Sequence, residues 1–501
     1  MSDLYKKHLV LIAMISSTSL IFLNATLFPV ALPTIQKELG VSLSTLQWII
    51  NAYLLTTSIF VIAGGRLADL FGSRKIFCLG VSLYSIASVM GGFAETGWWL
   101  VMSRAIQGTG GALMSPSGMS LLIHAYPENQ RGKAIGIMVA IGSLFLSLGP
   151  FIGGAFTEYL SWRWAFGINP PIALLGIIMI MRAVPKSEKQ KERFDFIGFF
   201  AMSFAITCLT IALMQGKIWG WSSGKTLFFF LLSLTLFLAV RGLERFAKEP
   251  FFKFSLFKTR IYMGGCFLII CAQFMLMITV FWPIFFQKVL FDSPMVAGMI
   301  TAIGTIPLMI FAPISGNLTD RKGARLPLII GFSLLLLSFA WFASFLHMEK
   351  VPLLFPALFA FGAGISFVMT PVSSTTLSAV PKANAGVATG MYNTLRFTGA
   401  TIGVAVFGAI QVNVQDALFT DKLIKGPGTS GLNPHLFEGL LNDLPRSIEA
   451  AKALPPHMLS YVQKALIETS TTAFAVTNIA GALVALIALL ITIRFFKSKS
   501  A

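Results

Sequence analysis

Charged residues are scarce in this chain. Asp, Glu, Lys and Arg make up 12% of its 501 residues, and hydrophobic residues make up 55%. Soluble domains carry about 25% charged residues. The mean hydropathy is +0.79. A soluble globular protein is therefore excluded, and the composition predicts an all-α polytopic membrane protein whose solvent is the lipid bilayer.

Acidic residues are scarcer than basic ones, with 20 Asp and Glu against 38 Lys and Arg, so the net charge is +18. Such a charge is also found in proteins that bind nucleic acid. Here, however, the basic residues lie in short segments between apolar runs. That distribution is typical of the positive-inside topology of membrane proteins, and it excludes nucleic acid as a partner.

Cysteine is limited to four residues within apolar runs, and no CxxC or Cys/His metal spacing occurs. The sequence therefore predicts reduced thiols, no metal and no cofactor. We also find no nucleophile–base pair and no phosphate-binding loop, so an enzyme is not expected. The first apolar run lacks a following cleavage site of small residues, which predicts a retained helix.

Fourteen apolar runs are long enough to cross a bilayer, which takes about 20 residues. They cover about 9–32, 46–65, 75–94, 98–123, 134–157, 164–183, 196–215, 225–243, 261–287, 295–318, 325–346, 352–379, 385–413 and 469–494. Lys and Arg are concentrated in every second connecting segment. This bias predicts that both termini are cytoplasmic.

A short polar turn occurs twice, about half the chain apart. Its copies are Gly65–Lys75 and Gly316–Arg325, and five positions are identical in register, namely Gly65/Gly316, Leu67/Leu318, Asp69/Asp320, Gly72/Gly323 and Arg74/Arg325. Glycine permits a sharp turn, and Asp can accept hydrogen bonds at a helix start or pair with Arg. A single copy would only set topology, whereas two copies indicate a duplicated protein of the transporter kind.

The repeat predicts three parts. Residues 1–184 form a first six-helix bundle, residues 185–260 form a linker with two inserted membrane helices, and residues 261–501 form a second six-helix bundle. The second bundle includes a long outer loop over 414–468, whose prolines and alternating charges predict a partly helical cap outside the membrane.

The turn resembles the signature G-x-L-a-D-r-x-G-r-k of the major facilitator superfamily. The fourteen spans resemble its drug:proton antiporter branch of the EmrB/QacA type, because twelve-helix members lack the inserted pair. The resemblance implies the superfamily fold, two six-helix bundles plus two inserted helices. It also implies that Gly65, Asp69, Gly72, Arg74, Asp320 and Arg325 form a conformational latch between the bundles.

Arg104 and Gln107 lie in the fourth run, within R-A-I-Q-G-T-G. The stretch is similar to the family motif R-x-x-q-G-x-g, whose arginine is implicated in proton coupling. Charges within a membrane span are costly, so most are functional or paired. The alternative is an arginine that extends to the outer membrane interface.

The fifth run contains Gly136, Gly142 and then Gly149-Pro150-Phe151-Ile152-Gly153-Gly154. Small residues permit close helix packing, and proline bends a helix. The run resembles the antiporter motif of exporters, in the residues Gly149, Pro150, Gly153 and Gly154, although Phe145 replaces one glycine. The alternative is a generic glycine-rich helix. The run Trp162–Pro171 also resembles the fourteen-helix branch.

Asn24 marks the main departure from the family pattern, in which the first helix carries an aspartate at this point. Asn cannot titrate, and no carboxylate is predicted at mid-depth in the membrane. Proton coupling then rests on Glu158, at the outer end of the fifth run, or on Arg104. Asn24 itself either contacts the substrate or packs against a neighbouring helix.

Asn393 and Arg396 lie in the thirteenth run, with Arg396 near the membrane midplane. An unpaired arginine facing a cavity would suit an anionic substrate. The alternative is an arginine whose charge is satisfied by helix carbonyls. Aromatic residues such as Tyr53 and Tyr392 could line a pocket for amphiphiles.

These observations predict a secondary transporter in the bacterial cytoplasmic membrane that exports amphiphilic or toxic small molecules by alternating access. Proton antiport is the expected coupling, and a periplasmic adaptor protein is a candidate partner. One alternative is an exporter or facilitator of an anionic metabolite such as a siderophore. Another is a non-transporting membrane sensor, which would show no flux.

Overall fold

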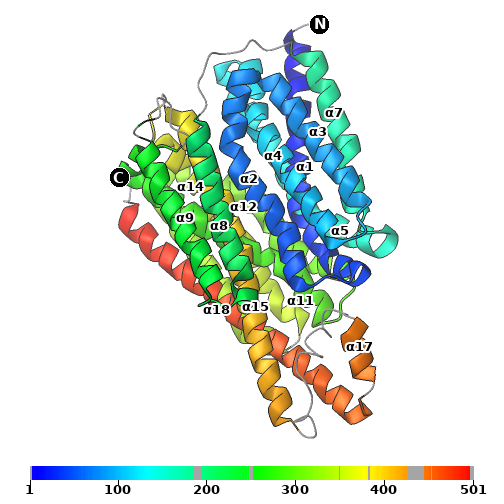
Figure 1. Cartoon of the computed structure of the whole chain (residues 1–501). Helices are drawn as coiled ribbons and strands as arrows, with labels where there is room; N and C mark the ends of the chain where they lie inside the picture. Colours follow the sequence, from blue (N-terminus) through cyan, green and yellow to red (C-terminus); the bar gives the residue numbers. More distant parts are fainter. Residues whose placement is uncertain are drawn as a thin grey trace.

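The computed structural model describes residues 3–185, 195–244, 246, 252–348, 350–381, 384–426, 445–452 and 454–496. Every regular element in these ranges is a helix, and most helices run side by side through one elongated body (Figure 1). The predicted all-α class is therefore confirmed.

The first bundle is formed by six spans, the sixth of which is broken into two helices. Its elements are α1 (Asp3–Leu39), α2 (Leu43–Phe71), α3 (Ser73–Gly92), α4 (Gly97–Ala125), α5 (Glu128–Ala155), α6 (Trp164–Gly167) and α7 (Asn169–Ala183). The helices are joined by short turns, and Ser42 and Thr96 accept the backbone N–H of the third following residue to cap α2 and α4.

The second bundle repeats this order after the inserted pair, α8 (Phe196–Trp219) and α9 (Gly224–Leu243). Its elements are α10 (Arg260–Leu276), α11 (Phe281–Lys288), α12 (Pro294–Lys322), α13 (Arg325–Phe345), α14 (Phe355–Ser378), α15 (Ala385–Lys425), α17 (Pro445–Lys452) and α18 (Pro456–Phe495).

Equivalent helices make equivalent contacts in the two bundles. In the first bundle α4 packs between α2 and α3, and α1 packs against α5 and α7. In the second, α14 packs between α12 and α13, and α10 packs against α15 and α18. The bundles meet along two seams, one between α5 and α12 and one between α2 and α15. The two halves of the chain, which the repeated polar turn indicates to be duplicates, therefore also pack their helices in the same way.

The inserted helices pack on each other, and α8 lies over the seam between α2 and α15. The amide of Asn51 on α2 donates to Sδ of Met214 on α8 at 2.9 Å. The rings of Phe60 and Phe199 lie 5.7 Å apart between the same helices. The predicted domain borders at 184 and 260 stay a prediction, since much of the adjoining linkers lies outside the described residues.

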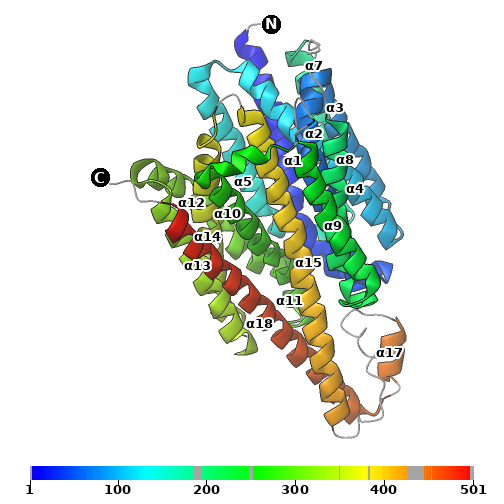
Figure 2. The ribbon, with the colours of Figure 1, turned by 60° about the vertical axis from the view of Figure 1, so that its left-hand side comes forward.

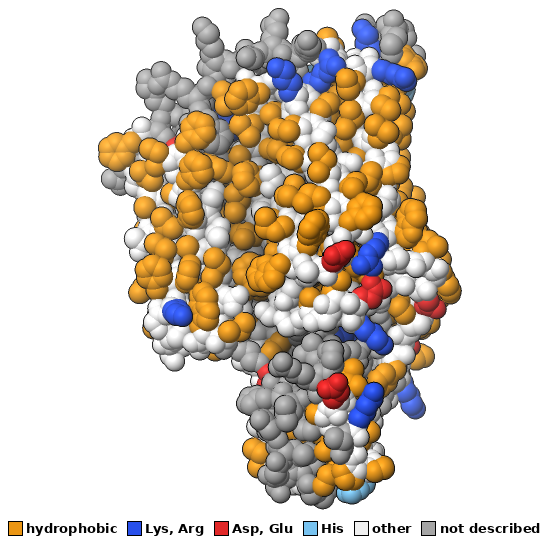
Figure 3. Space-filling view, turned by 45° about the vertical axis from the view of Figure 1, so that its right-hand side comes forward, with side chains coloured by type: hydrophobic (Ala, Val, Ile, Leu, Met, Phe, Trp, Pro, Cys, Tyr) orange, Lys and Arg blue, Asp and Glu red, His pale blue; other side chains and the backbone are white. Residues whose placement is uncertain are grey.

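Thirteen of the described helices are long and apolar enough to span a membrane. The remaining predicted span is α4, which is 29 residues long but carries Arg104, Gln107 and several Gly and Ser residues. Hydrophobic side chains cover the bundles in a broad band, whereas charged side chains lie mainly at the top of the view and below the band, down to the stalk (Figure 3). The chain is accordingly a multi-pass membrane protein.

The last two spans are longer than predicted. The thirteenth run was expected to end at 413 and the fourteenth to begin at 469, but α15 continues to Lys425 and α18 begins at Pro456. Their extensions and α17 project beyond the bundles (Figures 1 and 2). We call residues 414–425, 445–452 and 456–468 the stalk.

A small core of Phe419, Leu423, Val462, Ala465 and Leu466 holds the two long helices of the stalk together. An ion pair between Lys422 and Glu468 adds to it. The predicted outer loop is therefore largely helical where it is described, because apolar positions at helical spacing continue past the membrane on both helices. Residues 427–444 lie outside the described part.

Both polar turns lie at the end of the molecule opposite the stalk, which we call the turn face. Gly72 has a φ of 94° and Gly323 a φ of 77°. Each donates its N–H to the carbonyl four residues earlier, Ala68 at 2.9 Å and Thr319 at 2.8 Å. Residues with a side chain rarely adopt such a φ, so the glycine in each copy is required by its backbone conformation.

Candidate functional site

Arg104 is buried in the first bundle, with only 3% of its surface exposed. Its guanidinium lies 4.6 Å from the ring centre of Phe28 on α1 and 4.4 Å from that of Tyr53 on α2. A cation between two aromatic faces is stabilised by their negative electrostatic potential. The alternative of an arginine that extends to the membrane interface is therefore wrong.

A chain of hydrogen bonds connects Arg104 to Asn24 through four helices. Arg104 donates to the side-chain oxygen of Gln107, and the amide of Gln107 donates to Ser88 on α3 at 2.9 Å. Asn169 on α7 donates to the same Ser88 oxygen at 3.1 Å. All five side chains are buried, so their mutual bonds replace those they would make in water. We call them the polar network.

Asn24 takes part in the polar network as a donor. Its Nδ2 donates to Oδ1 of Asn169 at 2.7 Å and to the Leu20 carbonyl at 3.0 Å, and Asn169 donates back to Oδ1 of Asn24 at 3.3 Å. An aspartate cannot donate when it is ionised. The geometry is thus built for an amide, and it supports the expected packing role of Asn24 against a neighbouring helix.

Arg396 is half-buried on α15, in the second bundle, with Asn393 one turn earlier and also half-buried. Its Nε is buried and makes no hydrogen bond among the described residues. Its guanidinium lies 5.6 Å from the ring centre of Phe397. Tyr53 on α2, whose ring contacts Arg104 in the first bundle, also lies within electrostatic range of Arg396 across the seam between α2 and α15.

Neither arginine has a carboxylate partner among the described residues. The Nε of Arg104 is buried without a hydrogen bond, as is that of Arg396. A buried cation whose donors are unsatisfied costs free energy, which a carboxylate, phosphate or sulfonate group would recover. Both guanidinium groups therefore keep unsatisfied donors among the described residues.

The glycines of α5 permit its close contact with α1. A Cβ atom on Gly149 would collide with the hydroxyl of Thr26 and lie 3.0 Å from its Cβ, and one on Gly153 would collide with the Leu27 carbonyl. Thr26 donates to the Leu146 carbonyl at 2.7 Å. These glycines therefore serve close packing of α5 on α1, as small residues do in membrane helices generally, and their role in an antiporter motif stays a prediction.

The end of α5 also forms the seam with the second bundle. A Cβ on Gly154 would lie 2.6 Å from the Pro294 carbonyl of α12, and one on Gly298 would collide with the Pro150 carbonyl. Glu158, just beyond α5, accepts from the Ser293 hydroxyl at 2.6 Å and from the Met295 N–H at 2.8 Å. Glu158 therefore caps α12 across the seam, and it belongs to this contact rather than to the polar network.

Each seam also carries a reciprocal pair of hydroxyl–carbonyl bonds near mid-depth. Ser147 donates to the Thr305 carbonyl at 3.1 Å and Thr305 to the Ser147 carbonyl at 3.3 Å. Ser58 donates to the Thr394 carbonyl at 3.2 Å and Thr394 to the Ser58 carbonyl at 3.1 Å. These pairs connect the bundles in equivalent ways at both seams.

The residues expected to form the latch lie on the turn face in both halves. Asp69 and Asp320 are exposed near the ends of α2 and α12, and Arg74 and Arg325 are partly buried near the starts of α3 and α13. Arg74 donates to the Met181 carbonyl of α7 at 3.4 Å. The latch itself stays a prediction.

Asn169 and Ser88 are central to the polar network, yet the sequence did not single them out as functional. Asn169 occurs in the run Trp162–Pro171, which we used only to identify a branch. A signal was present, because Asn169 is a polar residue at the start of an apolar helix. Ser88 carries no such signal, since single serines are common in membrane helices.

The Major Facilitator Superfamily profile matches residues 14–404 of this chain. The chain belongs to the major facilitator superfamily. Within the superfamily it is 31% identical to the multidrug resistance protein Stp of Mycobacterium tuberculosis, over 78% of this chain and 73% of that protein. It is 30% identical to the tetracenomycin C resistance and export protein of Streptomyces glaucescens, over 82% and 77%.

Another superfamily relative is the riboflavin transporter RibZ of Clostridioides difficile, which is 28% identical over 81% of this chain and 88% of that protein. Among solved structures, an inward-facing, occupied bacterial homologue of the lysosomal transporter Spinster matches with a TM-score of 0.63. The two are 15% identical, and the match covers 99% of this chain and 98% of that one. At this identity the likeness shows the fold alone.

Together the profile and the relatives show that this superfamily member is a membrane transporter of small molecules and not an enzyme. Its relatives include multidrug resistance and export proteins, as expected for the drug-efflux branch. These relatives do not favour the alternative of a membrane sensor that transports nothing.

Proposed function

We propose that this chain exports amphiphilic small molecules by alternating access, driven by a proton gradient. The observation that carries the proposal is the close fit of α5, where Gly149 and Gly153 face α1 and Gly154 faces α12. These are the glycines of the motif typical of exporters. The relatives named for multidrug resistance and export support the same direction of transport.

The contacts at different depths suggest how access alternates. The bond from Ser293 to Glu158 closes the seam at the end of the bundles from which the stalk projects, which we call the stalk face. The reciprocal Ser and Thr pairs at mid-depth act as pivots, and the latch residues of the two turns hold the turn face in the opposite state. Alternating access requires that the stalk-face contacts break when the latch forms.

Glu158 is the proposed proton acceptor, because Asn24 cannot titrate. Its carboxylate accepts from the N-terminal end of α12, where negative charge is favoured by the helix dipole. Protonation would remove that charge and weaken the contact across the seam. For net antiport, a proton taken up at Glu158 while the stalk side is open must leave towards the turn face before the contact with α12 forms again.

The bias of Lys and Arg supports a cytoplasmic turn face with both termini, and so a stalk on the outside of a bacterial cytoplasmic membrane. A periplasmic adaptor protein remains a candidate partner at the stalk face. Cysteine labelling at stalk position Lys464 with a membrane-impermeant reagent in intact cells tests the orientation, because labelling is expected only if the stalk is outside.

Ethidium efflux from proteoliposomes tests the proposal. Wild-type protein should move ethidium against its gradient when a pH gradient is imposed, and Glu158→Gln should uncouple transport from that gradient while gradient-free exchange persists. Glu95→Gln, at an exposed glutamate on the same face, serves as the control. Ethidium movement that ignores the pH gradient in the wild type would reject proton coupling.

A second candidate function is transport of an anionic metabolite, and it rests on Arg104 and Arg396. Both have a buried Nε without a hydrogen bond, and neither has a carboxylate partner among the described residues. An anionic cargo would supply the missing acceptors. In this case the negative charge of the cargo neutralises Arg104 and Arg396, so transport does not require a titrating carboxylate between the bundles.

Fluorescent anion flux separates the two candidates. For anionic cargo, Arg396→Gln should weaken anion transport at least about tenfold, because a charge-assisted contact is lost. Arg396→Lys should retain more of it, and ethidium should not be transported. Gradient-driven ethidium efflux with no anion flux would reject the second candidate. If the wild type moved only the anion and Asn24→Asp moved ethidium, the natural Asn24 would mark a change of this chain from cationic to anionic cargo.

A further inference from the structure

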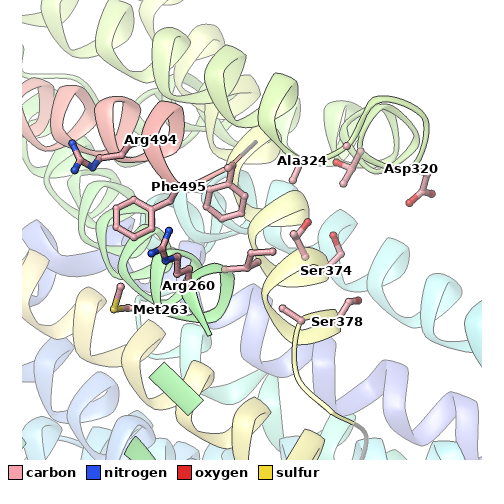
Figure 4. A pocket seen from close by; sticks show the side chains of 14 residues that line it. Arg260, Met263, Asp320, Ala324, Ser374, Ser378, Arg494 and Phe495 are labelled. Carbon is pink, nitrogen blue, oxygen red and sulfur yellow. The ribbon is translucent and has the colours of Figure 1, made fainter. Parts of the chain in front are cut away.

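A pocket lies at the turn face of the second bundle, away from the seams between the bundles. Its volume is about 1030 Å³, and it is enclosed by the ends of α10, α12, α14 and α18 together with the second turn (Figure 4). Apart from Asp320 of the latch, no residue that lines it takes part in the transport mechanism described above.

The pocket is cationic at one end. Figure 4 shows Arg260 of α10 and Arg494 of α18 at the same end, with Asp320 at the opposite end. Packing explains the pairing of the arginines. A Cβ on Gly264 would lie 3.4 Å from Cβ of Phe495, so α10 and α18 touch there. Arg260 lies one helical turn before Gly264 on the same face, and Arg494 precedes Phe495.

The remainder of the lining is suited to an amphiphile. Phe495 and Phe496 give the pocket an apolar wall. Figure 4 shows Phe495 on the side of Arg260 and Arg494, and Ser374 and Ser378 at the end of α14. Arg260 and Arg494 are exposed, so they can reach a ligand without a large desolvation cost. Among the described residues, neither forms a salt bridge.

We propose that this pocket binds the phosphate group of an anionic membrane lipid, with Arg260 and Arg494 on the phosphate and the Ser374 and Ser378 hydroxyls on the rest of the headgroup. Arginine matches phosphate geometry through its fork of N–H donors. Basic pockets between membrane helices on the cytoplasmic side are suited to lipid headgroups. A soluble phosphate would satisfy the same arginines but would not need the apolar wall.

The bound headgroup would connect moving parts of the second bundle. The pocket wall includes Asp320, Gly323 and Ala324 of the second turn, along with the ends of α10 and α18. A lipid held there would fix the position of this turn relative to both helices. The transport rate would consequently depend on anionic lipid, although binding itself requires no transport.

Native mass spectrometry of the purified chain after exchange into phosphatidylglycerol or phosphatidylcholine vesicles tests the proposal. Wild-type protein should retain a phosphatidylglycerol molecule that survives activation. The double variant Arg260→Gln/Arg494→Gln should lose it, with retention falling roughly twentyfold or more, as expected when two arginines near a membrane are removed. Phosphatidylcholine should be retained equally by both proteins.

Two further variants keep the outcome decisive. Arg321→Gln/Lys322→Gln removes the same charge from exposed residues of the turn face that do not line the pocket, and it should leave retention unchanged. Arg260→Lys/Arg494→Lys should restore part of it. If Arg321→Gln/Lys322→Gln lost phosphatidylglycerol to the same extent, the retention would be explained by the general positive charge of the turn face. The proposed binding site would then be rejected.

Inorganic phosphate distinguishes the two sources of the ligand. In detergent without lipid, weak phosphate binding that vanishes in the double glutamine variant, with no preference for phosphatidylglycerol, would replace the lipid by a soluble phosphate and overturn the lipid proposal. Absence of both effects would reject the site altogether. Ethidium flux does not enter this test, so the proposed function can fail independently.

Discussion

The hydroxyl of Thr26 on α1 donates a hydrogen bond of 2.7 Å to the backbone carbonyl of Leu146 on α5. Leu146 lies four residues before Pro150, and proline has no N–H with which to occupy that carbonyl. Gly149 leaves the space into which Thr26 fits. The proline therefore frees an acceptor, the threonine satisfies it, and the glycine makes room for the threonine.

Gly149→Ala should destabilise the contact between α1 and α5. Its new methyl group would collide with Thr26, and overpacking in a tight interface costs about 1–3 kcal/mol. Thermal unfolding of the purified protein in detergent measures the loss. Gly136→Ala is the matched control on the same helix, because a Cβ there meets nothing within 4 Å. Equal melting temperatures for the two variants would contradict this account.

Asn169→Leu should weaken the polar network at both of its neighbours. Asn24 would lose its 2.7 Å acceptor, and Ser88 would lose one of its donors. Hydrogen bonds between membrane helices contribute about 0.6–1.7 kcal/mol, so a loss of about 1 kcal/mol or more is expected in unfolding experiments. Asn413→Leu is the control, since the amide of Asn413 bonds to the Ala409 carbonyl of its own helix. A larger loss in the control would refute the prediction.

Ser147 and Thr305 should each stabilise the seam independently, because each hydroxyl donates to the backbone carbonyl of the other residue. Ser147→Ala and Thr305→Val should each lower the free energy of unfolding by about 0.6–1.7 kcal/mol, and the double variant should lose the sum, since neither substitution removes the acceptor of the other bond. Thr301→Val is the control on α12, because the Thr301 hydroxyl bonds to the Ala297 carbonyl within that helix. A loss in Thr301→Val as large as that in Thr305→Val would contradict the role of the seam bonds.

Asp292→Asn should stabilise the fold near neutral pH. Asp292 lies between α11 and α12, and its Oδ2 is buried without a hydrogen bond among the described residues. Burial raises the pKa of Asp292. The ionised form is therefore the costly one in the fold. That cost is present above the raised pKa and disappears as the pH falls below it.

The melting temperature of Asp292→Asn should accordingly exceed that of the wild type near neutral pH, and the two should converge at about pH 4 and below. The gain should not exceed about 1 kcal/mol, because the carboxyl is partly exposed to solvent. Glu95→Gln, at an exposed carboxyl, provides the comparison across the same pH range. A difference that grows at acidic pH would have the wrong sign.

The fold was predictable from the sequence because membrane helices obey strong rules. The lengths of the apolar runs predicted the membrane spans, and the two copies of the polar turn predicted the internal repeat. The structure has a glycine with positive φ in each copy, at Gly72 and Gly323. The ends of the last two spans were not predictable from apolar length. The helices of the stalk are stabilised by their own small core, and length in the membrane says nothing about that core.

The candidate site was predictable only in part. Charge in an apolar run identified Arg104 and Arg396, since such residues are rare in membranes. The sequence could not show that Asn24 and Asn169, far apart in the chain, would exchange hydrogen bonds. Nor could it show that Glu158 would cap a helix of the other bundle, because that contact depends on how the bundles meet.

The stalk has a mechanical consequence. The helix α15 runs without interruption for 41 residues, about 60 Å, from the turn face through the seam with α2 to the stalk tip. If α15 rotates as a rigid body about the seam, its far end moves further than any point of the helix inside the membrane. A dye or antibody fragment attached near Lys425 would therefore report the rotation of the second bundle as a large displacement. A ligand that held the stalk tip in place would slow the transport cycle from outside the bilayer.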